Sequence, residues 1–73
     1  MYESGDMIEF TDLGEFPKSY VLSYDKHYEV KGTYTCGSFE IADDKGNVCW
    51  IDVYKHDYIM KVSWFKRLIL LQV

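Results

Sequence analysis

The chain has 73 residues, of which 48% are hydrophobic and 18% aromatic, and its formal net charge is −4. This length allows one domain, near the lower size at which a single hydrophobic core is sufficient, and the apolar content argues against a disordered chain. The acidic balance disfavours direct nucleic-acid binding, because phosphate recognition requires clustered lysine and arginine.

The first third of the chain predicts one short strand followed by a long loop. The segment "MIEF" (7–10) fits a strand, and "TDLGEFPKSYVLSYD" (11–25) follows it. Gly14 and Pro17 break regular structure in this second segment, so we expect it to be irregular.

The segment "HYEVKGTYT" (27–35) alternates between apolar and polar residues. This period of two predicts a strand with Tyr28 and Val30 facing inward. Gly32 would permit a bulge or a sharp bend in that strand.

The segment "FEIADDKGNVCWIDV" (39–53) predicts a β-hairpin with a three-residue loop that places Gly46 in the left-handed region. In that register Ala42 pairs with Val48, and a slip of one residue would either bury Glu40 or expose Phe39 and Ile41. We therefore expect Trp50 to point outward. The opposite face is then entirely apolar and consists of Phe39, Ile41, Cys49, Ile51 and Val53.

Three further segments complete the chain. The short polar segment "YKHDY" (54–58) fits one turn of 3₁₀ helix, and "IMKVS" (59–63) returns to a strand-like alternation. The tail "WFKRLILLQV" (64–73) fits a helical stripe but also suits a strand, so both remain open for it.

The segments "DMIEFTD", "LSYDKHYEV", "SFEIADDKGNVCWIDV" and "DYIMKV" resemble the compact SH3-like proteins that are common in tailed-phage and bacterial genomes. The resemblance covers residues 6–62 and implies a mostly β fold, namely a small SH3-like barrel of about five antiparallel strands with a short 3₁₀ turn. The apolar C-terminal segment lies outside the resemblance. We therefore expect a single domain over residues 1–73, with the barrel at about 6–62 and a C-terminal extension at 63–73.

Signalling SH3 domains are a more distant resemblance, and they suggest a binding face. Trp50 and Tyr58 resemble the tryptophan and tyrosine of their peptide groove, and Asp12 and Glu15 lie on the loop that carries acids in such domains. The "A-L-Y-D-Y" motif is absent, and Asp52 stands near the position of the groove proline. We therefore do not expect recognition of polyproline helices.

No catalytic or metal-binding motif is apparent in the sequence. Cys36 and Cys49 are too few for a disulfide framework, so we interpret them as reduced thiols of a cytoplasmic protein. Without a C-x2-C pair, we predict two buried thiols and two surface histidines, His27 and His56, instead of a zinc site. We expect no enzyme activity, no cofactor and no metal.

Seven tyrosines, two tryptophans and four phenylalanines exceed what so small a core can hold. Exposed aromatic residues commonly anchor protein interfaces, although Trp50 could also simply lie over a neighbouring loop. The predicted partner-binding residues are Trp50, Tyr54 and Tyr58, joined by Tyr20 and Tyr24 and by the acidic Asp12 and Glu15.

The tail is a second candidate interface because its side chains are too apolar to be left in water. Packing against its own barrel, docking into a second copy or a partner, and lying on a membrane surface with Lys66 and Arg67 near the headgroups are all open. The residues concerned are Trp64, Phe65, Leu68, Ile69 and Leu71. The sequence contains no run long enough to span a membrane.

The charge is unevenly distributed: residues 1–53 contain eleven acids and four bases, a net −7, and residues 54–73 contain four bases and one acid, a net +3. We expect a non-catalytic protein-interaction module in the cytoplasm (the host cytoplasm if the source is viral). The phage resemblance implies an accessory protein that binds and modulates or inhibits a host protein. The alternatives are a nucleic-acid-associated factor using the basic segment 54–67, or a structural homo-oligomer assembled through the tail.

Overall fold

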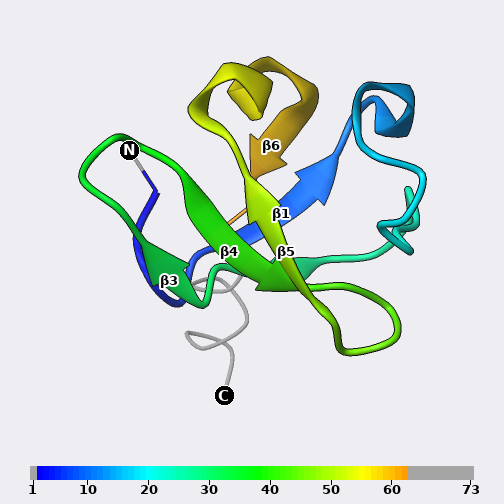
Figure 1. Ribbon diagram of the computed structural model, residues 1–73, viewed down its shortest axis with the longest axis horizontal. Helices are drawn as coiled ribbons and strands as arrows, with labels where there is room; N and C mark the ends of the chain where they lie inside the picture. The colour runs from blue at the N-terminus through cyan, green and yellow to red at the C-terminus, as the bar shows by residue number, and fades with distance from the viewer. Residues whose placement is uncertain (1, 63–73) are drawn as a thin grey trace, which may run out of the picture.

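The computed structural model describes residues 2–62 and is built mostly of β-strands. Within that range, two three-stranded antiparallel sheets have the strand orders β2-β1-β6 and β3-β4-β5 (Figure 1). The strands are β1 (Met7–Phe10), β2 (Tyr28–Glu29), β3 (Gly32–Thr33), β4 (Phe39–Ala42), β5 (Val48–Ile51) and β6 (Ile59–Lys61). The mostly β prediction is confirmed.

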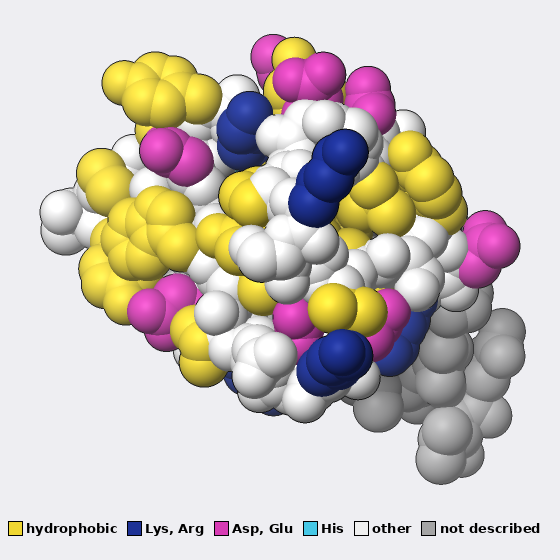
Figure 2. Space-filling model, turned by 45° about the vertical axis from the view of Figure 1, so that its right-hand side comes forward, with side chains coloured by type: hydrophobic (Ala, Val, Ile, Leu, Met, Phe, Trp, Pro, Cys, Tyr) yellow, Lys and Arg dark blue, Asp and Glu magenta, His cyan; other side chains and the backbone are white. Residues whose placement is uncertain are grey.

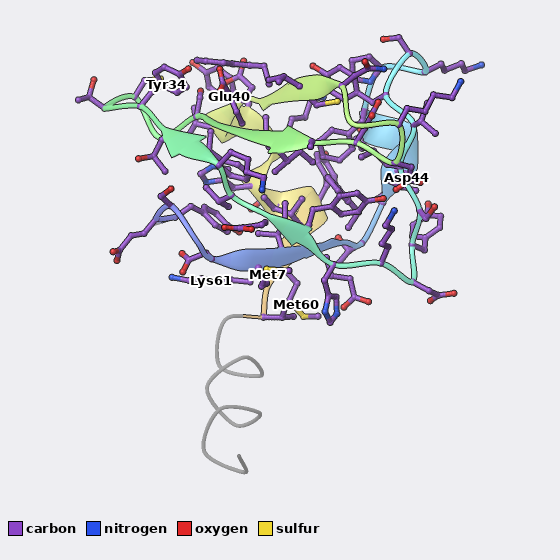
Figure 3. The ribbon with its side chains drawn as sticks, turned by 90° about the horizontal axis from the view of Figure 1, so that it is seen from below. Met7, Tyr34, Glu40, Asp44, Met60 and Lys61 are labelled. Carbon is purple, nitrogen blue, oxygen red and sulfur yellow. The ribbon has the colours of Figure 1, made fainter. Side chains whose placement is uncertain are left out.

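The two sheets lie one over the other with side chains between them (Figure 3). The pairing among the described strands does not join β5 to β6, so the hydrogen-bonded ladder does not close into a barrel. The C-terminal extension at 63–73, predicted as helix or strand, lies outside the described residues.

The predicted strand at 27–35 is divided between the two sheets. The Val30 N–H donates to Asp6 O at 2.8 Å on the side of the first sheet, and the next residue, Lys31, donates its N–H to Glu40 O at 2.8 Å in the second sheet. The chain therefore changes sheets between β2 and β3. Tyr28 and Val30 are buried, as the alternation predicted.

The β4–β5 hairpin has the predicted register, in which Ala42 lies opposite Val48. Its loop closes with the Asp43 N–H donating to Asn47 O at 2.8 Å, and Gly46 has φ +85°. A left-handed backbone is sterically favourable only for glycine, which is why the turn occurs at this residue.

Over residues 2–62, two 3₁₀ helices connect the strands: η1 (Leu13–Glu15) in the long loop and η2 (Val53–Tyr58) after β5. The second confirms the predicted turn at 54–58 and begins one residue earlier. Val53, predicted on the apolar face of the hairpin, instead opens η2 and is half-buried.

The core lies between the sheets and is formed by side chains from both. Its buried hydrophobic residues are Ile8, Phe10, Phe16, Tyr28, Val30, Phe39, Ile41, Cys49, Ile51 and Ile59. Because the inward side chains of β4 and β5 are used in this core, their alternate residues face outward.

Candidate interaction surface

Trp50 lies on the outer face of the β3-β4-β5 sheet, directly across from Glu40 of β4. The Trp50 side chain is 43% exposed, and its ring centroid lies 4.5 Å from that of Tyr34. The predicted outward orientation of Trp50 is confirmed. The contact with Tyr34 creates an aromatic surface where the chain turns from β3 toward β4.

Glu40 adds a carboxylate to this surface. The Tyr34 hydroxyl donates a 2.6 Å hydrogen bond to Glu40 Oε1, and this bond is the main cause that raises the pKa of the Tyr34 phenol above its usual value. Gly32 lies opposite Glu40 across the sheet. An added Cβ at Gly32 would lie 3.8 Å from Glu40 Oε2, so the glycine keeps that side of the carboxylate free of side-chain atoms. We call Tyr34, Glu40 and Trp50 the Trp50 cluster.

Figure 3 shows the side chains of Tyr34 and Glu40 next to each other on the outside of the sheet, away from the core. In Figure 2, one group of hydrophobic side chains lies at the left with acidic side chains next to it, and another lies at the upper right. The large hydrophobic residues exposed on the described surface are Tyr24, Tyr34, Val48, Trp50, Tyr54 and Met60.

Tyr20 was predicted to join Trp50 in the aromatic cluster. It does reach Trp50, but its hydroxyl group makes the contact, not its ring. That hydroxyl donates to the backbone carbonyl of Trp50 at 3.0 Å, while the half-buried Tyr20 side chain packs against the core. The next residue, Val21, donates its N–H to Asp43 Oδ2 at 3.2 Å and accepts from the Asp44 N–H at 2.8 Å. These bonds fasten the long loop to the hairpin beside the Trp50 cluster.

The acidic loop residues have mainly a local role. Asp12 caps η1, because its Oδ1 accepts from the Gly14 N–H at 3.0 Å. Tyr24, 51% exposed, holds the same turn by accepting from the Leu13 N–H at 3.0 Å. Glu15 is exposed.

Tyr54 and Tyr58 lie on η2, which packs against η1. Tyr54 is 83% exposed, whereas Tyr58 is half-buried against the core with Lys55 Nζ 6.0 Å from its ring centroid. Among the described residues, neither ring contacts Trp50. The predicted aromatic cluster is therefore divided. The Tyr20 hydroxyl reaches Trp50, whereas the backbone carbonyl of Tyr58 accepts from the N–H of Thr11, the residue before Asp12, at 2.9 Å.

Tyr34 and Glu40 were not predicted as site residues. The signal for Glu40 was in the sequence, because the correct hairpin register already placed it beside Trp50 on the outer face. No such signal existed for Tyr34, because its position beside Trp50 depends on the change of sheet between Val30 and Lys31.

The prediction of two buried thiols and two surface histidines is right for Cys49 and His27 and wrong for Cys36 and His56. Cys49 is buried, and burial raises its pKa, but Cys36 is exposed. Hydrogen bonding with Ser38 lowers the pKa of Cys36. His56 is half-buried instead of lying at the surface. Over residues 2–62, no group of three or more His, Cys, Asp or Glu side chains is placed to hold a metal ion.

The second predicted interface, at Trp64, Phe65, Leu68 and Ile69, lies outside the described residues. Comparison of the chain with protein-family models, curated proteins and solved structures gave no match. Within the part that the structure describes, no helix has the length and apolar character needed to cross a bilayer.

Proposed function

We propose that this chain is a small SH3-like module that binds another protein through the Trp50 cluster. The order of its elements supports the SH3-like interpretation. A first strand, a long irregular loop, a strand, a tight hairpin, a 3₁₀ turn and a last strand follow one another as the resemblance implies. Fold alone carries little functional information, so the proposal rests on the surface.

The observation that carries the proposal is the exposed Trp50 ring, which lies against Tyr34 beside the side chain of Glu40. Tryptophan and tyrosine each bury about 150–250 Å² when covered, and they dominate the energetics of many interfaces. The Trp50 ring lies against Tyr34 of the β3–β4 loop, and its backbone carbonyl accepts a hydrogen bond from Tyr20 of the long loop. Both contacts reduce the entropy that binding would cost at this residue. Glu40 offers a charge to a lysine or arginine of the partner.

The charge of the molecule favours a basic partner surface. The described residues include most of the acidic segment 1–53, with its net charge of −7 from eleven acids and four bases. Such a charge raises the rate of encounter with a positive surface. From the phage resemblance, we propose that the partner is a host protein and that the module modulates or inhibits it by covering part of its surface, without catalysis.

The test compares wild type with Trp50→Ala and Val48→Ala. Val48 lies on the same strand and the same outer face, is 72% exposed, and therefore serves as the matched control. A protein captured from bacterial lysate would be purified and titrated by calorimetry against each variant, with folding checked by circular dichroism. Loss of an anchor at the centre of an interface weakens binding by about 30-fold or more, whereas Val48→Ala should change it less than about threefold.

Equal affinity of Trp50→Ala and wild type would overturn the proposal. Two rival functions are separated by the same samples. Binding to DNA or RNA that weakens steeply with salt would favour a nucleic-acid factor, and a mass in solution that rises with concentration would favour a homo-oligomer.

A further inference from the structure

The Glu40 side chain is bordered by small residues on two sides of the outer sheet face. Its cross-strand neighbour on β3 is Gly32, which has no side chain, and Ala42 is the next residue of β4 on the same face. An added Cβ at Gly32 would lie 3.8 Å from Glu40 Oε2. A partner's side chain can therefore approach the carboxylate from these two sides.

An aromatic ring lies on a third side of Glu40. Trp50 is its cross-strand neighbour on β5, and side chains in such pairs have Cβ atoms about 4.5–5.5 Å apart. Trp50 and Tyr34 are 43% and 44% exposed, and the hydrogen bond between Tyr34 and Glu40 lies at the surface. A group that lies on the exposed part of the Trp50 ring is thus within reach of the carboxylate.

The Glu40 carboxylate keeps unused acceptor sites in a fixed orientation. Its Oε1 accepts the 2.6 Å bond from the Tyr34 hydroxyl, and its Oε2 accepts no hydrogen bond from residues 2–62. Because that bond raises the pKa of the Tyr34 phenol, Tyr34 keeps its proton and remains the donor. A carboxylate has about four lone-pair sites, so a second donor can bind at Oε2 and at the other lone pair of Oε1.

None of the ion pairs within residues 2–62 uses Glu40. The three pairs are Lys26–Asp44, Lys31–Glu29 and Lys61–Asp6. Lys31 comes near Glu40 through its backbone, since its N–H donates to the carbonyl of Glu40, but its Nζ lies 3.3 Å from Glu29 Oε1. The acceptor sites of Glu40 are therefore open to a cation from another molecule.

We propose that the Trp50 cluster binds an arginine of the partner protein, with the guanidinium plane on the Trp50 ring and its N–H groups donating to Glu40. Arginine combines a flat face that stacks on aromatic rings with a fork of five donors that fits a carboxylate. Lysine provides a compact, strongly hydrated charge that can pair with Glu40 but has no plane to lie on the ring. The identity of the occupant rests on the proposed function, because that supplies the partner.

The site can be tested without the partner. The ¹⁵N-labelled full chain would be titrated at low ionic strength with the peptide acetyl-Gly-Arg-Gly-amide. Two further peptides carry lysine or citrulline, the uncharged analogue of arginine, in its place. We expect saturable shifts of the Gly32 and Glu40 amides and of the Trp50 indole N–H, with a dissociation constant on the order of 10 mM for the arginine peptide. The citrulline peptide should bind about fivefold more weakly and the lysine peptide about threefold more weakly.

Three variants separate the parts of the site. Glu40→Gln can still accept from Tyr34 but carries no charge, so it should bind the arginine and citrulline peptides alike. Trp50→Ala should weaken binding of the arginine peptide about threefold, because the stacking surface is lost. Glu29→Gln makes the same change of charge at an exposed position on the other sheet, and it should leave the preference for arginine intact.

Several results would overturn the inference while leaving the role of Trp50 in partner binding standing. They are equal binding of the arginine and citrulline peptides to wild type, no saturable shift at the three reporter groups, and an equal loss in Glu29→Gln and Glu40→Gln. Equal binding of the arginine and lysine peptides would overturn the assignment to arginine.

The proposed function fails by a different measurement. An unchanged affinity of Trp50→Ala for the captured protein would overturn that function, while the preference of wild type for the arginine peptide would still stand. Arg67 is the single arginine of the chain. Self-association that Arg67→Gln abolishes would assign the surface to a second copy and would overturn the partner-protein occupant.

Discussion

The hydroxyl of Tyr28 donates a 2.6 Å hydrogen bond to Asp44 Oδ1, which joins β2 of one sheet to the hairpin turn of the other. Lys26 Nζ and Ser23 Oγ also donate to the Asp44 carboxylate, each at 2.8 Å. These bonds, with that from Lys26 the largest contribution, lower the pKa of Asp44 from 3.8 to about 2. One carboxylate thus holds the end of the long loop against the hairpin.

Replacing Asp44 by asparagine should lower the thermal midpoint by several degrees, because charge-assisted bonds from Lys26 and Tyr28 are weakened together. Asp25→Asn, an exposed position in the same loop, makes the same change of charge and should leave the midpoint nearly unchanged. Thermal unfolding followed by circular dichroism measures both. Equal midpoints for the two variants would show that the Asp44 network does not contribute to stability.

The same carboxylate makes stability depend on pH. Because its folded pKa of about 2 lies below the unfolded 3.8, ionised Asp44 stabilises the fold above pH 3.8, and this contribution is lost as the pH falls toward 2. Asp43 acts in the same direction: burial opposes its ionisation, but backbone N–H donors from Asn47, Val21 and Lys45 lower its pKa overall. Urea midpoints measured between pH 7 and pH 2.5 should fall less steeply in Asp44→Asn than in wild type. A parallel fall would contradict this assignment.

Two substitutions in the hairpin test its register. Ile41 is fully buried, so Ile41→Val should reduce the free energy of unfolding by about 0.5–1.5 kcal/mol. Val48 is 72% exposed, and Val48→Ala should change it by less than about 0.5 kcal/mol. Urea denaturation gives both values. A larger cost at Val48 than at Ile41 would mean that the register is shifted by one residue.

Gly46 should resist substitution for a backbone reason alone. Its φ is +85°, and nothing lies within 4 Å of an added Cβ, so any cost of Gly46→Ala comes from the left-handed conformation. We expect a loss of about 1–2 kcal/mol for alanine and a smaller loss for asparagine, which tolerates this region better. Gly32→Ala, where φ is ordinary and the nearest atom lies at 3.8 Å, is the control and should cost less than Gly46→Ala.

The two thiols should react at different rates. Cys36 is exposed and hydrogen bonding with Ser38 lowers its pKa, whereas Cys49 is buried and its pKa is raised by burial. Iodoacetamide at pH 8 should therefore modify Cys36 first, and Cys49 only after denaturant is added. Peptide mapping by mass spectrometry identifies the modified residue, and Cys36→Ser, which should stop labelling of the native chain, is the control.

The sequence by itself determined the two strands of the hairpin, their register and the orientation of Trp50. The alternation of apolar residues around Gly46 allows only one register that buries Phe39 and Ile41 while leaving Glu40 outside. These features depend on the local period of two and on the conformational freedom of one glycine, so they can be inferred from neighbouring residues.

Only the tertiary structure decided what Trp50 contacts. Tyr34 meets it because the chain passes from one sheet to the other after Val30, and Tyr20 meets it because the long loop is tied down to Asp43 and Asp44. A hollow lined by Tyr2, Tyr34 and His56 likewise requires the N-terminal segment, the β3–β4 loop and η2 to come together. Such contacts join segments that are far apart in the sequence, and the period of a strand says nothing about which loops will pack over it.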